Sequence, residues 1–205
     1  MLKRIGAVLM AGGAAIALIG TGSTSSFANV TPHATTWKVS PGGKVTGSAT
    51  KPTLKDTKSG TTLTCASSST TATLKSGSNP IGSISALSFK TCTGPVGLTF
   101  TVKLNGLPYK LNANSESSGV VKGTITGIKA VLSGSGCTAD VDGTSASSAG
   151  QVTGTYTNST GVLKVSGGNL HIWNVNGCFG LIANGDPSTY SASYKITPKQ
   201  TITEG

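Results

Sequence analysis

The sequence predicts an all-β protein with antiparallel sheets, built as a two-sheet β-sandwich or a flattened barrel of about twelve short strands. Three observations support this fold class. Serine and threonine contribute 58 of the 205 residues and glycine 29, whereas charged residues make up 11%. Short runs alternate between apolar and polar residues, and no stretch has a helical period. Alternation gives each sheet one wet and one dry face, so two dry faces must be buried against each other.

The clearest alternation lies in the runs 98–104 and 107–111. Asn105-Gly106 stands between them and is a strong signal for a tight turn. We therefore expect a β-hairpin over 98–111. Further strands are expected at 36–40, 43–49, 61–66, 70–75, 84–91, 120–132, 137–142, 151–157, 162–166, 169–176 and 190–196.

The N-terminus has the features of a secretory signal peptide. Lys3-Arg4 is followed by the apolar run 5–20 and a small-residue segment that ends at Ala28. Cleavage is expected after Ala28, with Ala34 as the second choice. The predicted organisation is a signal peptide at 1–28, a flexible lead-in at 29–36, one β domain at 37–198 and a tail at 199–205. Faint internal similarity leaves open two related halves, 37–118 and 119–198.

The four cysteines agree with export, because an even number in an exported protein suggests disulfides. Cys65 and Cys92 lie in the first half, and Cys137 and Cys178 lie in the second. Three pairings are possible. The similar contexts of the cysteines in the two halves favour Cys65 with Cys92 and Cys137 with Cys178.

The charge balance restricts the partners that the protein can have. Without Lys3 and Arg4, the chain has 14 lysines, 6 acidic residues and no arginine. The lysines are scattered, so nucleic-acid binding is not predicted. A diffuse positive surface favours anionic envelope polymers or acidic lipid surfaces. No membrane span is expected in the mature chain, because the apolar run is shorter than a span of about 20 residues.

Few residues are candidates for a site. Trp37 and Trp173 are the tryptophans that could stack on sugar rings. Asp140 and Asp142 share a strand face and are weak candidates for a hard-cation site. His171 reads as a strand residue rather than a catalytic base, and no catalytic residue, metal or cofactor is predicted.

Several segments resemble small secreted proteins of streptomycete-type actinobacteria that have no assigned activity. These segments are 63–68, 81–84, 92–95, 123–127, 156–160 and 169–171. The resemblance implies source and secretion. In composition and expected fold the chain is also similar to the enediyne-carrying apoproteins of the neocarzinostatin type, which are secreted sandwiches with two disulfides that carry a chromophore.

The leading functional hypothesis is a secreted, non-enzymatic binding or structural protein that acts at or outside the cell envelope. Extracellular or cell-wall polysaccharide and anionic envelope polymers are its expected partners. A carrier of a small apolar ligand in a β-sandwich cleft is the first alternative, and it requires a sizeable apolar cavity. A hydrolase with an unrecognised site is the second.

Overall fold

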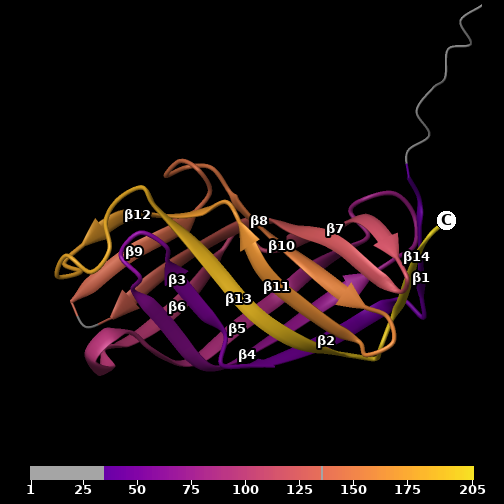
Figure 1. Cartoon of the computed structure of the whole chain (residues 1–205), viewed down its shortest axis with the longest axis horizontal. Coiled ribbons are helices and arrows are strands. Elements are labelled where there is room, and N and C mark those ends of the chain that lie inside the picture. Colours follow the sequence, from indigo (N-terminus) through magenta and orange to yellow (C-terminus); the bar gives the residue numbers. More distant parts are fainter. Residues whose placement is uncertain (1–34, 135) are drawn as a thin grey trace, which may run out of the picture. The chain divides into compact units, whose positions relative to one another are not determined.

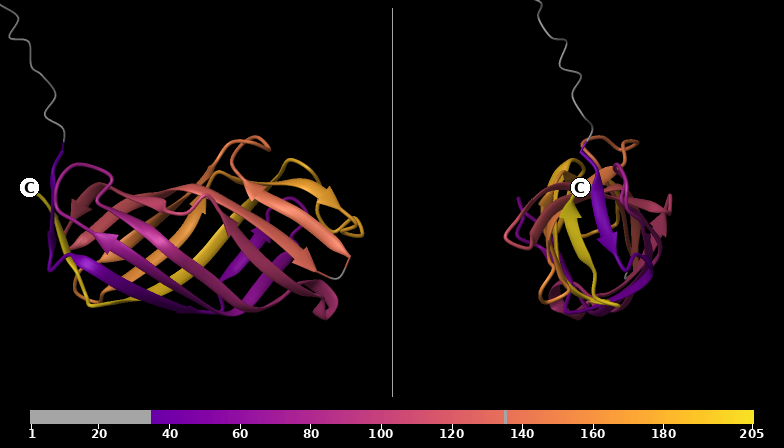
Figure 2. Two further views of the ribbon diagram at one scale, coloured as in Figure 1. Left: turned by 180° about the vertical axis from the view of Figure 1, so that it is seen from behind. Right: turned by 90° about the vertical axis from the view of Figure 1, so that its right-hand side faces the viewer.

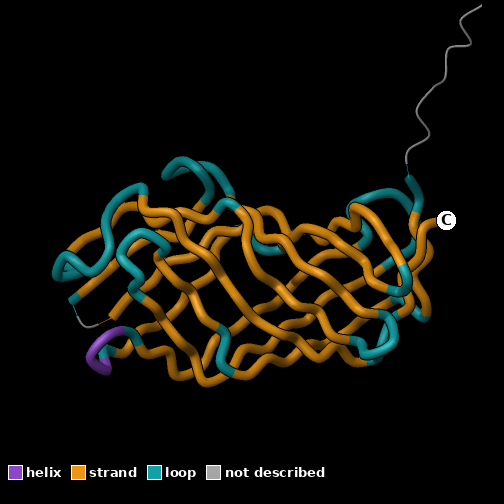
Figure 3. The backbone as a smooth tube through the Cα atoms, viewed as in Figure 1, coloured by secondary structure: helices purple, strands orange, loops and turns teal. Residues whose placement is uncertain are grey.

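A computed structural model describes residues 35–134 and 136–205. About two thirds of the described residues lie in strands, and one short 3₁₀ turn, η1, lies at Pro95–Gly97 (Figure 3). The predicted signal peptide and its cleavage points at Ala28 and Ala34, with most of the lead-in at 29–36, lie outside the described residues. Among the residues that are described, no helix has the length and apolar character needed to cross a membrane.

The described residues form fourteen strands. They are β1 Trp37–Ser40, β2 Gly43–Thr50, β3 Thr53–Asp56, β4 Thr62–Leu74, β5 Gly82–Thr93, β6 Thr99–Asn105, β7 Tyr109–Ser117, β8 Val120–Gly134, β9 Cys137–Asp142, β10 Gly150–Thr157, β11 Val162–Gly168, β12 Leu170–Asn176, β13 Asp186–Thr197 and β14 Thr201–Glu204. All their pairings are antiparallel, as the alternating pattern predicts.

Twelve of these strands form one sheet that closes on itself (Figure 1). Four positions around the sheet hold the long strands β4, β5, β8 and β13, and the other four positions each hold two short strands end to end. These pairs are β2 with β3, β6 with β7, β9 with β10, and β11 with β12. The sheet closes because β13 pairs with β2 and with β3. The predicted all-β, antiparallel fold is confirmed, in its flattened-barrel form.

The structure corrects the prediction of a tail at 199–205, because Thr201–Glu204 forms strand β14 and pairs with β1. This two-stranded sheet crosses one end of the closed sheet (Figure 2, right). The side chain and backbone of Gln200 hold it there. Its Oε1 accepts a hydrogen bond from Gly42 N at 2.8 Å, and its backbone N donates to the Tyr156 hydroxyl at 2.8 Å.

The predicted hairpin at 98–111 is wrong. Strands β6 and β7 do not pair with each other but run in the same direction, one after the other, between β5 and β8. The Tyr109 hydroxyl bridges the break by donating to the carbonyls of Asn105 at 3.0 Å and Lys129 at 2.7 Å. Strand β8 is long enough to pair with both short strands over most of their lengths, and β5 pairs only with the far end of each. The local turn signal at Asn105-Gly106 does not select the partner.

Two further differences concern the first half of the domain. The predicted strands 61–66 and 70–75 are one strand, β4, because Ser67–Ser69 pair with β2 on one side and β5 on the other. Strand β3 was not predicted. It forms because Thr53–Lys55 lie against both β4 and β13, so its backbone groups are satisfied from two sides.

The disulfides are Cys65–Cys92 and Cys137–Cys178, which confirms the favoured pairing. Cys65 and Cys92 are directly opposite each other in the β4–β5 ladder. Cys137 begins β9, and Cys178 follows β12, which pairs with β9. The second bridge therefore joins the ends of two strands that already share a ladder. No free cysteine is present among the described residues.

Candidate functional site

The two tryptophans that the sequence singles out lie in different places. Trp37 is only 1% exposed and belongs to the hydrophobic core. Its backbone N and O pair with Gly77 at the end of the molecule that β1 and β14 cross. Trp37 therefore has no free ring face, and the expectation that it stacks on a sugar is wrong.

Trp173, His171, Asp140 and Asp142 come together on the outer face of β9 and β12. His171 is opposite Asp142 in the ladder, and Trp173 is opposite Asp140. The Trp173 Nε1 donates to Gly143 O at 3.0 Å, and its ring stacks with the His171 ring at a centroid distance of 6.4 Å. The Trp173 side chain is partly buried, so part of its surface remains accessible to solvent, and its role in stacking on a sugar stays a prediction.

Among the described residues, His171, Asp140 and Asp142 form no hydrogen bond with one another. The His171 Nδ1 lies 3.0 Å from Asn169 O, and Asp140 Oδ2 accepts from Asn174 at 2.6 Å. Burial raises the pKa of the Asp142 carboxyl above its ordinary value. No group of three or more His, Cys, Asp or Glu side chains among the described residues is placed to hold a metal ion.

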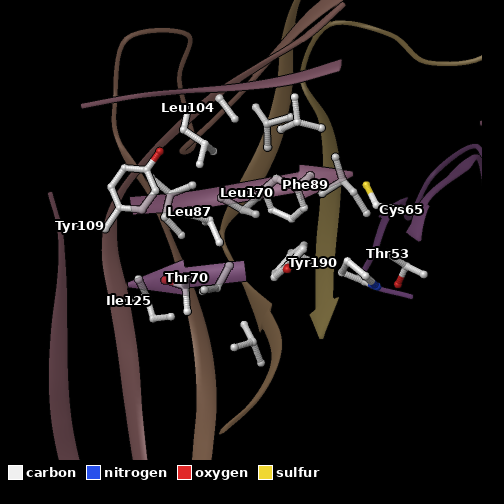
Figure 4. A pocket seen from close by; sticks show the side chains of 18 of the residues that line it. Thr53, Cys65, Thr70, Leu87, Phe89, Leu104, Tyr109, Ile125, Leu170 and Tyr190 are labelled. Atoms are coloured by element: carbon white, nitrogen blue, oxygen red, sulfur yellow. The ribbon is translucent and has the colours of Figure 1, made fainter. Parts of the chain in front are cut away.

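The most distinctive feature of the molecule is a hollow, apolar interior. A cavity of about 100 Å³, here called the central cavity, lies inside the closed sheet. Leu87 and Phe89 of β5, Leu104 of β6, Leu170 of β12 and Tyr190 of β13 point into it (Figure 4). Several of its large lining side chains remain partly exposed although they face inward. A close-packed interior would bury such side chains almost completely.

A second cavity of about 100 Å³ lies beside the first, below β14, and is here called the end cavity. The two cavities share five lining residues, which are Thr70, Ile84, Ile125, Leu163 and Val165. Both are lined almost wholly by apolar atoms. Each cavity is about two thirds the size of an engineered apolar cavity of roughly 150 Å³ that binds benzene.

One polar group of side chains borders the central cavity. The Ser68 Oγ and the Tyr194 hydroxyl are 2.8 Å apart, and the Tyr194 and Tyr190 hydroxyls are 2.7 Å apart. Burial raises the pKa of both phenols above the ordinary value, so both rings stay neutral at physiological pH. The three hydroxyls satisfy one another, and the cavity wall beside them stays apolar.

Sequence reasoning missed a second pair of buried acids, Asp56 and Asp186. The Lys58 Nζ donates to Asp186 Oδ1 at 3.0 Å, and the Ala183 N donates to Asp186 Oδ2 at 2.7 Å. Asp56 Oδ1 accepts from the backbone N of Lys58 and of Ser59. These contacts join two loops at one end of the sheet, which is a structural role. The local sequence around Asp56 and Asp186 does not predict this contact, because the two segments are about 130 residues apart.

Sequence reasoning also missed the cavity. The alternation in 98–104 and 190–196 indicates which side chains face inward, but not whether the space between them is filled. No protein-family model, curated protein or solved structure matches the chain. The fold and the cavity together define the class of protein. It is a disulfide-linked, closed antiparallel β protein with a hollow apolar core.

Proposed function

We propose that this protein is an extracellular, non-enzymatic binding protein that encloses a small apolar molecule inside its closed sheet. The observation that carries the proposal is the pair of adjoining apolar cavities, which share a wall at Ile125 and Leu163. Binding sites for small molecules are concave, mostly apolar and largely preformed. A large hydrophobic side chain left half-buried in an interior gains contacts when a ligand fills the space.

Two disulfides support an extracellular location, because such bonds persist in oxidising compartments. One of these bonds, Cys65–Cys92, lies in the wall of the central cavity, since Cys65 is one of its lining residues. A rigid wall keeps the cavity open without a ligand. The sugar-stacking version of the envelope hypothesis has weaker support, because Trp37 is buried and Trp173 is held by Gly143.

The proposal is tested with N-phenyl-1-naphthylamine, a neutral dye whose fluorescence increases in apolar surroundings. We expect the oxidised protein to bind the dye and octanol to displace it. The variant Ile125→Phe adds volume at the junction of the two cavities, and we expect it to weaken dye binding about tenfold. The matched control is Val96→Phe, which adds a ring at a residue that is 93% exposed.

Circular dichroism and thermal unfolding of Ile125→Phe establish that the variant is folded. Overpacking of a filled core costs about 1–3 kcal/mol, whereas filling a real cavity costs less. Equal dye binding by wild type and Ile125→Phe, or no binding by either, would rule out the interior as a ligand site.

A further inference from the structure

The wall of the closed sheet is interrupted between β5 and β6. Strand β5 pairs with β6 only at Cys92 and Thr93, and with β7 only from Gly82 to Ile84. Residues 85–91 of β5 and 101–108 of the facing chain have no pairing between them, although all of them are described. On their other sides, β5 is paired with β4 along most of its length and β6 is paired with β8.

The conformation of β5 changes at both ends of this interruption. In the pairing with β4, Ala86 and Ile84 lie opposite two consecutive residues of β4. Ser85, between them, therefore has no partner on β4 and forms a bulge. At the other end, Thr91 has a φ of 50°, outside the range of strands. Bulges and kinks of this kind bend a strand and end its pairing. They direct the middle of β5 away from β6.

Apolar side chains line both sides of the interruption. Leu87 and Phe89 come from β5, and Val102 and Leu104 come from β6. All four border the central cavity, and all four are partly exposed. Figure 4 shows Leu87, Phe89 and Leu104 around the same space. At the interruption, these four side chains and no hydrogen-bonded backbone ladder lie between the apolar cavity and the outer face of the sheet.

The outer face beside the interruption is positively charged. Lys90 follows Phe89, and Lys103 lies between Val102 and Leu104, so alternation places both lysines on the outer face. Both are exposed, and neither forms a salt bridge within the described residues. The stretch 57–115 holds five lysines and no acidic residue. The interruption therefore combines an apolar lining on the inside with two exposed lysines on the outside.

We propose that the ligand is a single-chain amphiphile with an anionic head. The alkyl tail lies in the central cavity between Phe89 and Leu104, and the head lies outside, beside Lys90 and Lys103. This inference rests on the proposed function and specifies its ligand. Lysine supplies compact, flexible positive charges that a carboxylate, sulfate or phosphate head can approach from solvent. Because the head remains in water, it loses little hydration and its attraction to the lysines is screened by salt.

The test compares octanoate, octanol and octyltrimethylammonium, which share a tail and differ in head charge. Their binding to the oxidised protein is measured by isothermal titration calorimetry at low and high salt. We expect octanoate to bind about tenfold more tightly than octanol at low salt, and octyltrimethylammonium to bind most weakly. High salt is expected to reduce the advantage of octanoate and to leave octanol unchanged.

The double variant Lys90→Gln/Lys103→Gln is expected to bind octanoate and octanol equally, with octanol affinity as in wild type. The matched control is Lys44→Gln/Lys164→Gln, which removes the same charge from exposed positions on β2 and β11. We expect the control to keep the preference for octanoate. Gln is shorter than Lys but remains polar, so folding should be unaffected at these exposed sites.

The outcomes separate this inference from the proposed function. Binding of octanol with no preference for octanoate would overturn the anionic head and leave the apolar binding site standing. A preference for octanoate that survives Lys90→Gln/Lys103→Gln would overturn the location of the head beside these lysines. Loss of the preference in the control alone would overturn the location of the head. Failure of all three compounds to bind would overturn the proposed function itself.

Discussion

Asp142 and Asp186 are both buried, yet their surroundings have opposite electrostatic effects. Burial raises the pKa of the Asp142 carboxyl, and the charge of Lys129 offsets part of this effect. The hydrogen bond from Lys58 lowers the pKa of the Asp186 carboxyl. A carboxyl whose pKa is raised by folding is ionised at a cost to the folded state at neutral pH. A carboxyl whose pKa is lowered by folding stabilises the folded state at neutral pH.

We therefore predict opposite effects of two isosteric substitutions. At pH 7, Asp142→Asn should raise the free energy of unfolding, and Asp186→Asn should lower it. The gain in Asp142→Asn should shrink as the pH falls through the raised pKa, because the wild-type carboxyl then becomes protonated. The loss in Asp186→Asn should shrink as the pH falls below the ordinary range of about 4. Urea denaturation between pH 3 and pH 7 measures both, and effects of the same sign at pH 7 would contradict the prediction.

At the scale of the element, the sheet depends on breaks that place two short strands in one position. Strands β11 and β12 meet at Gly168 and Asn169. The Asn169 Oδ1 accepts from Gln151 N at 2.8 Å, and the Asn169 N donates to Gln151 O at 3.1 Å. Gly168 has a φ of 124°, and a Cβ there would lie 2.2 Å from Gln151 O. The break needs a residue without a side chain.

We predict that Gly168→Ala lowers the free energy of unfolding by about 2 kcal/mol or more, because backbone atoms must move apart. Gly180→Ala is the matched control. Gly180 also has a positive φ, of 73°, but a Cβ there would meet nothing within 4 Å. Its cost should be about 1 kcal/mol, which reflects the backbone conformation alone. Urea denaturation of both variants decides the matter, and equal costs would show that the close approach at Gly168 is unimportant.

At the scale of the whole molecule, β14 closes one end of the hollow interior. Ile202 lines the end cavity, and Gln200 is 1% exposed. The Tyr156 hydroxyl donates to Gln200 O at 2.9 Å. The seven residues from 199 to 205 therefore separate the apolar interior from water. Their removal would leave the buried Tyr156 hydroxyl without its partner Gln200.

We predict that a chain ending at Pro198 loses about 3 kcal/mol or more of unfolding free energy, from lost apolar burial and unsatisfied polar groups. Its tryptophan fluorescence should shift to longer wavelength, because Trp37 loses its pairing with Glu204 and becomes exposed. A chain ending at Glu204 serves as the control, because it keeps both Gln200 and the pairing of Trp37 with Glu204. If the shorter chain does not fold, Gln200→Ala tests the same closure. Unchanged stability and emission in both would contradict the role of β14.

The sequence alone determined the fold class, the antiparallel pairing and the disulfide preference. Alternation is a local property, because successive side chains of a strand point to opposite faces whatever the partner is. The runs 98–104 and 190–196 therefore identified inward-facing residues correctly. The similar contexts of Cys65 and Cys137, each followed by a later cysteine in its own half, indicated the pairing that the structure contains.

Tertiary structure alone decided which strands are neighbours and how full the interior is. The Asn105-Gly106 signal predicted a hairpin, but β8 is long enough to pair with both β6 and β7 in a single position. Trp37 was predicted to stack on sugars only because it is a tryptophan. Its burial depends on β14, which is more than 160 residues away in the sequence. The cavity depends on side chains from strands throughout the domain. Pairing partners and empty volume are non-local quantities, and no local pattern in the sequence records them.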